Sequence, residues 1–85
     1  MDLRITTSAN DQGTTIRVEG RLTVEGVGKL ERQFQLAEKP VELDLSGLIS
    51  TDDHGVRALK ALSAGGATLS GASTYIRQLL DKGGG

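Results

Sequence analysis

The sequence predicts an α/β domain with a mixed four-stranded sheet and three helices mainly on one face of that sheet. Four short segments alternate apolar and polar residues, as half-buried strands do. Three longer segments repeat apolar residues every three or four positions, as amphipathic helices do. Because the partner positions are polar in every strand, only one face of the sheet has an apolar lining for helices to cover.

Four strands are expected, and the first two form a pair. Residues 3–6 and 15–19 alternate in hydrophobicity, and residues 8–13 between them are rich in turn-forming residues, so this pair is predicted to be a hairpin. A third strand is predicted at residues 41–45 and a fourth, shorter one at residues 67–70.

The helices alternate with the later strands, giving the order strand, strand, helix, strand, helix, strand, helix. The predicted inward positions are Val27, Leu30, Phe34 and Ala37 in the first helix, Val56, Leu59 and Leu62 in the second, and Ile76, Leu79 and Leu80 in the third. Thr23 and Ser73 are expected to cap the first and third helices, because hydroxyl side chains accept the free backbone N–H groups of a first turn. Pro40 and the pair at 65–66 are expected stop signals.

Length and composition restrict the function. With 85 residues the chain forms one domain, expected at residues 1–82, with a flexible glycine tail at 83–85. A net charge of -1 and only two aromatic residues argue against binding nucleic acid. The absence of cysteine excludes disulfides and cysteine-based metal sites. With neither a signal peptide nor a long apolar run, a cytoplasmic domain without membrane insertion is expected.

The densest group of polar residues lies between the third strand and the second helix. It consists of Ser50, Thr51, Asp52, Asp53, His54 and Gly55. One interpretation is helix capping, since Asp52 or Asp53 at a helix start complements the positive end of the dipole. A metal or acid–base site is the other, but Asp53 and His54 diverge by about 100° on a helical wheel, and the chain has no second histidine. We therefore expect no catalytic, metal or cofactor site and no enzymatic activity.

Five segments together resemble the signature of STAS domains, the fold of bacterial anti-sigma factor antagonists. These segments are 20–22, 43–48, 51–59, 67–73 and 76–80. The family typically has an apolar strand ending in Asp-Leu-Ser, and then Asp-Ser-Ser-Gly at the start of a helix with a leucine-rich face. The resemblance covers nearly the whole chain in order and spacing, and it implies a domain that acts by binding other proteins.

The resemblance also implies a docking site and a partner. In the family, an anti-sigma factor that is a serine kinase phosphorylates the first Ser of Asp-Ser-Ser-Gly, and phosphorylation separates the two proteins. Here Asp53 occupies that position and His54 the next, while Asp52 and Gly55 match the flanking residues. The implied partner-binding residues are Asp52, Asp53, His54, Gly55, Val56 and Arg57. Asp53 would either mimic the phosphorylated state imperfectly or suit a partner that prefers a permanent charge.

Several alternatives stay open at this point. Thr51 and Ser50 are neighbouring hydroxyls that could replace the missing phosphoacceptor. The short form of the chain resembles STAS-like accessory subunits of ABC-type lipid or solute transporters, so transporter subunits are the alternative partners. The short form would also leave an open sheet edge, which could pair with a partner or with a second copy in a homodimer. Arg57 could also be an ordinary exposed residue of the helix. The terminal glycines resemble the Gly-Gly end of ubiquitin-like sulfur carriers, although the three predicted helices do not fit a carrier of that kind.

Overall fold

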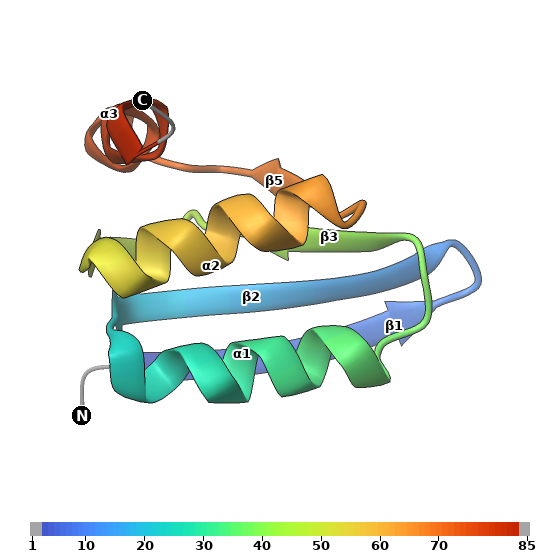
Figure 1. Cartoon of the computed structure of the whole chain (residues 1–85). Helices are drawn as coiled ribbons and strands as arrows, with labels where there is room; N and C mark the ends of the chain where they lie inside the picture. Colours follow the sequence, from blue (N-terminus) through green and yellow to red (C-terminus); the bar gives the residue numbers. More distant parts are fainter. Residues whose placement is uncertain (1–2, 84–85) are drawn as a thin grey trace.

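The computed structural model describes residues 3–83 as one mixed five-stranded sheet with three helices (Figure 1). The elements in chain order are β1 (Leu3–Asn10), β2 (Gly13–Leu22), α1 (Val24–Leu36), β3 (Val41–Asp44), β4 (Leu48–Thr51), α2 (Asp53–Ala64), β5 (Thr68–Ser70) and α3 (Thr74–Gly83). The predicted α/β class, with a mixed sheet and three helices, is confirmed. The strand count differs, because the sheet has five strands where four were expected.

The first two strands form the expected antiparallel hairpin, with a tighter turn than predicted. Asn10 pairs with Gly13, so only two residues remain in the turn, and residues 8–10 belong to β1. The Asn10 side-chain oxygen accepts a hydrogen bond of 2.7 Å from the Gln12 amide, which is the local contact of an Asx turn.

The additional strand is β4, which continues the path of β3 after a short detour. Both strands pair in parallel with β2, β3 along its first half and β4 along its last residues. Between them the Asp44 carboxylate accepts a 2.9 Å hydrogen bond from the Ser46 amide, and the Gly47 carbonyl accepts one of 2.9 Å from the Gly20 amide. These contacts interrupt the pairing with β2 after β3 and allow it to resume in β4. Residues 50–51, which were expected in a loop, therefore lie in a strand.

Pairing between strands gives the order β1-β2-β3-β5, with β4 beside β2. Figure 1 shows α1 and α2 lying across one face of this sheet, and α3, seen end-on, beside α2. The largest fully buried side chains are Ile16, Leu22, Leu30, Leu43, Leu45, Leu59, Ile76 and Val18. The opposite sheet face is mainly polar, with Arg17 and Glu19 3.7 Å apart, although Ile49 in β4 is also exposed. The predicted one-sided apolar lining therefore holds.

The helix ends agree in part with the prediction. Ser73 caps α3, since its Oγ accepts a 3.2 Å hydrogen bond from the Ile76 amide. Thr23 occupies the cap position of α1 but makes no side-chain capping hydrogen bond, so that expectation was wrong. Ala37, expected inside the first helix, is extended and follows its last turn.

The C-terminal boundary also shifts slightly. Gly83 belongs to α3, although the sequence places it in the tail, and the remaining two tail glycines lie outside the described residues. Within residues 3–83, no helix is long and apolar enough to cross a membrane.

Candidate functional site

The candidate site lies where β4 leads into α2 and where α1 begins alongside. Asp52 occupies the cap position of α2, and one of its carboxylate oxygens accepts a 2.8 Å hydrogen bond from the Gly55 amide. The other oxygen accepts a 3.1 Å hydrogen bond from the Val24 amide, in the first turn of α1. A single carboxylate therefore caps two helices and holds their starting turns together.

The electrostatics of Asp52 follow from this arrangement. The hydrogen bond from the Gly55 amide lowers the pKa of the Asp52 carboxyl below its usual value, and the Val24 amide and nearby His54 act in the same direction. Hydrogen bonds to the ionised form favour that form. Asp52 is thus a fixed negative charge at the positive ends of two helix dipoles.

Gly55 allows α2 to begin this close to the strands. A Cβ atom at this position would overlap the Thr51 Oγ1 and lie 2.9 Å from the Leu22 carbonyl oxygen. The Asp52 amide in turn donates a 3.0 Å hydrogen bond to that same Leu22 carbonyl. The glycine is therefore a packing requirement of the site.

The residues expected to contact a partner separate into two groups. Asp53, His54 and Arg57 are exposed on the first turns of α2. Gly55 and Val56 are buried, and Val56 is only 6% exposed, so the structure does not place these two on a docking surface. Helical periodicity explains why Val56 is buried, because it lies three residues before the inward-facing Leu59 on the same face of α2.

The two candidate phosphoacceptors are strand residues. Ser50 pairs with Arg21 and Thr51 with Leu22 at the end of the β2–β4 ladder. The Thr51 hydroxyl donates a 3.2 Å hydrogen bond to the Asp52 carbonyl and lies against Gly55, and its side chain is partly buried. The Thr51 side chain is therefore part of the packing around the Asp52 cap.

A groove between α1 and α2 opens beside the exposed residues. It has a volume of about 270 Å³, and its lining includes Val24, Val27, Glu31, His54 and Arg57. Val24 is 54% exposed, which is unusual for a valine in a helix that covers the core. We call this feature, together with Asp53, the α1–α2 surface.

Sequence reasoning missed the contribution of α1 to this surface. The available signal was the spacing of Val24, three residues before the inward-facing Val27 on the same helical stripe. This stripe extends into the first turn of α1, where Val24 is exposed beside α2.

The loop holds one histidine and two carboxylates, at positions 52–54. Among residues 3–83, no three His, Cys, Asp or Glu side chains lie together as metal ligands would. The Asp52 carboxylate is held by backbone amides and acts as a cap.

Comparison with known proteins agrees with the fold. A family model described as "Mlab, STAS domain" matches residues 5–84. A crystal structure of an anti-sigma factor antagonist, the STAS domain from Rhodobacter sphaeroides, superposes with a TM-score of 0.67 and 23% sequence identity, covering 86% of this chain and 94% of that one. At this identity the similarity supports the architecture. A search of curated proteins finds no match.

Proposed function

Because the chain belongs to the STAS domain family, we propose that it is a non-catalytic protein-interaction module that binds a regulatory protein through the α1–α2 surface. The fold is similar to that of an anti-sigma factor antagonist. The observation that carries the proposal is the double cap by Asp52, which fixes an exposed charged turn beside a partly apolar groove.

The chemistry of the α1–α2 surface suits a protein partner. Val24 and Val27 offer apolar contact area, while Glu31, His54 and Arg57 offer charge and hydrogen bonds around it. Protein interfaces commonly combine an apolar centre with a polar rim, and arginine is enriched in them. The Arg57 guanidinium suits a bidentate contact with a partner carboxylate.

The proposed partner is an anti-sigma factor of the serine-kinase type or a similar regulator. Asp53 stands where the family has its phosphorylated serine, and it carries one negative charge compared with about -1.5 to -2 for a phosphoserine. An aspartate cannot be phosphorylated and dephosphorylated as that serine is. We therefore propose a constitutive interaction that does not switch at this position.

The environment of Thr51 supports this view. Its hydroxyl is hydrogen-bonded to the Asp52 carbonyl and packed against Gly55, so a kinase would have to open the α2 start to reach it. Ser50 lies one residue earlier in β4, within the same strand pairing. A stoichiometric phosphoryl group on either residue, in protein purified from its native cell, would contradict a constitutive interaction.

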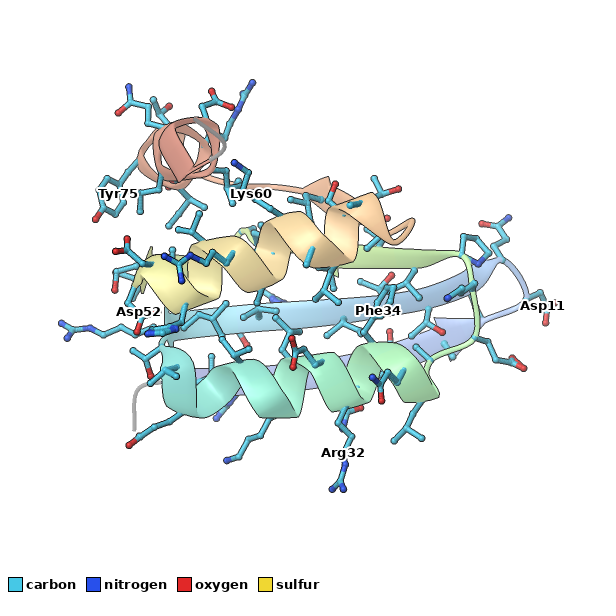
Figure 2. The ribbon with its side chains drawn as sticks, viewed as in Figure 1. Asp11, Arg32, Phe34, Asp52, Lys60 and Tyr75 are labelled. Atoms are coloured by element: carbon cyan, nitrogen blue, oxygen red, sulfur yellow. The ribbon has the colours of Figure 1, made fainter. Side chains whose placement is uncertain are left out.

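The experiment is an affinity capture from native lysate, with the captured proteins identified by mass spectrometry. Wild type and Asp53→Ser are the two baits, and Asp11→Ser is the matched control. Figure 2 shows that Asp11 lies at the hairpin turn, at the opposite end of the molecule from Asp52. Capture of a serine-kinase-type anti-sigma factor, stronger with Asp53→Ser and unchanged with Asp11→Ser, is the expected result.

A different outcome would identify the other candidate partner. If all baits capture ABC-transporter subunits equally, the chain is a transporter accessory subunit. Asp53 then contributes only a negative charge to the first turn of α2 and does not determine partner binding. Capture of neither class would contradict the proposed partner.

Surface variants then test where the partner docks. Val24→Asp places a charge at the α1–α2 groove and is expected to weaken binding of the captured partner at least tenfold. Leu36→Asp is the control, because Leu36 is also an exposed apolar residue of α1, 74% exposed, but ends the helix away from the groove. Equal binding by both variants would place the partner elsewhere.

A further inference from the structure

A second hollow lies between α2, β5 and α3. Its volume is about 670 Å³, within the range of roughly 300–1,000 Å³ for small-molecule pockets. Its lining includes Lys60 and Ser63 from α2, Leu69 from β5, and Arg77 and Leu80 from α3. None of these residues belongs to the α1–α2 surface, so the hollow requires its own explanation.

Lys60 is the most informative residue in this hollow. Its Nζ atom is buried and has no hydrogen-bond partner among the described residues. Figure 2 shows the side chain extending from α2 into the space beneath α3. A buried ammonium without an acceptor is unfavourable, because it loses water and gains no compensating hydrogen bond. An acceptor supplied by a bound molecule would satisfy it.

Arg77 adds a second positive charge to the same hollow. It is exposed on α3, and Asp81, one turn later, also lines the space. Helix residues four apart can pair, yet the only ion pair within 4.0 Å in the described part of the chain joins Arg17 and Glu19. The hollow thus combines two cations with one carboxylate that neutralises neither by direct contact.

The remaining wall is apolar. Leu69 and Leu80 are half-buried, and Ala72 from the β5–α3 connection lies between the same elements. A fitting molecule therefore needs an acidic head for Lys60 and Arg77 and a short apolar body for this wall. We propose that the hollow between α2, β5 and α3 binds a small amphiphilic anion, a carboxylate or phosphate ester, through Lys60 and Arg77.

The proposal does not depend on the partner-binding function. From α2 the groove takes His54, Arg57, Ala58 and Ala61, whereas the hollow takes Lys60, Ser63 and Ala64, so the two sites share no lining residue. A protein partner at the first site and a small anion at the second do not compete for the same residues.

The test is an amide chemical-shift titration by NMR with four probes: octanoate, octyl phosphate, octanol and inorganic phosphate. Binding of octanoate or octyl phosphate, with the largest shifts around residues 60, 69 and 80, is the expected result. The tighter of these two probes identifies the preferred acidic head. Octanol and inorganic phosphate, which each lack one half of the required chemistry, are expected to bind at least tenfold more weakly.

Variants establish the role of the ammonium. Lys60→Met keeps the length and packing of the side chain and is expected to weaken the tighter probe at least tenfold, since a charge-assisted hydrogen bond is lost. Lys60→Arg retains the charge and is expected to bind within a few-fold of wild type. Lys29→Met, which removes an exposed lysine of α1 outside the hollow, is the matched control.

The melting temperature of Lys60→Met provides the last test. Lys60→Met is expected to melt at or above the wild-type temperature, because it removes an unpartnered buried ammonium. Unchanged affinity in Lys60→Met, shifts confined to another surface, or no binding by wild type up to the solubility limit of the probes would each overturn the proposal.

Discussion

At the scale of single residues, two adjacent aspartates have different tasks. The Asp52 carboxylate accepts backbone hydrogen bonds from both helices, whereas Asp53 is exposed on the first turn of α2. The sequence predicted a cap at one of these two positions but could not choose between them. The choice depends on where the strand ends and on the approach of α1, which are properties of the folded chain.

Asp52→Asn is expected to destabilise the protein in a pH-dependent way. The pKa of Asp52 is lowered by folding, so its ionised form contributes stability that is fully present above the unfolded pKa of about 3.9. This contribution is lost as the pH falls through the lower, folded-state pKa. At pH 7 we expect the melting temperature to fall by a few °C, because the Asn side chain has one acceptor oxygen where the carboxylate has two, so one of the two backbone hydrogen bonds is lost.

Thermal melts of wild type and Asp52→Asn across pH 2–7, followed by circular dichroism, measure this effect. The two proteins are expected to converge at the acidic end. Asp53→Asn is the control and should change the melting temperature much less, because Asp53 accepts none of these backbone bonds. A gap that stays constant with pH would show that the charge of Asp52 does not stabilise the fold.

At the scale of elements, the contact between α2 and the end of the sheet depends on Gly55. Gly55→Ala is expected to lower the free energy of unfolding by about 1–3 kcal/mol, because the added methyl group overlaps Thr51 and crowds the Leu22 carbonyl. Gly28→Ala is the matched control, since no atom outside the neighbouring helix backbone lies within 4 Å of the added Cβ. That variant is expected to gain about 0.5–1 kcal/mol from helix propensity.

Urea unfolding of both glycine variants provides the measurement. The changes in the free energy of unfolding are expected to have opposite signs in the two variants. Helix propensity alone would stabilise both proteins. A stabilised Gly55→Ala would mean that α2 can move away from β4 without cost.

Most elements followed from local pattern, and the exceptions have physical causes. The strands that alternate and the helices with an apolar stripe were predictable because each buries one face. β4 was not, since Ile49 is 70% exposed and only Leu48 in this strand is buried. Its existence depends on β2 extending far enough to offer a partner, which is a long-range property of the chain.

At the scale of the whole molecule, β2 is the centre of the sheet. It pairs with β1 on one side and with β3 and β4 on the other. Hydrogen exchange is therefore expected to be slowest at buried β2 residues such as Ile16 and Val18. In β1, the amides that point away from β2 are expected to exchange fast, because half of the amides of an edge strand lack a ladder partner.

Exchange measured by NMR at two protein concentrations also tests the predicted homodimer. Protection of the outward-pointing β1 amides that increases with concentration would place a second copy on this edge. Fast exchange at both concentrations would leave the edge open and exclude a dimer formed there.

The candidate site was predictable only in outline. The sequence located it at the start of the second helix, because polar residues concentrate there and resemble a family signature. It did not reveal the groove with α1, since Val24 and Arg57 are far apart in sequence and meet only in the packed structure. The Lys60 hollow was missed for the same reason, as its residues come from three elements.

The shared carboxylate of Asp52 has a consequence for the kinetics and entropy of docking. Because the first turns of α1 and α2 are tied to one side chain, the two walls of the groove cannot separate independently. A partner would meet a surface already in its bound shape, and the backbone would lose little conformational entropy on association. Complex formation should then resemble rigid-body docking, with the free and bound backbones nearly superimposable at this end of the molecule.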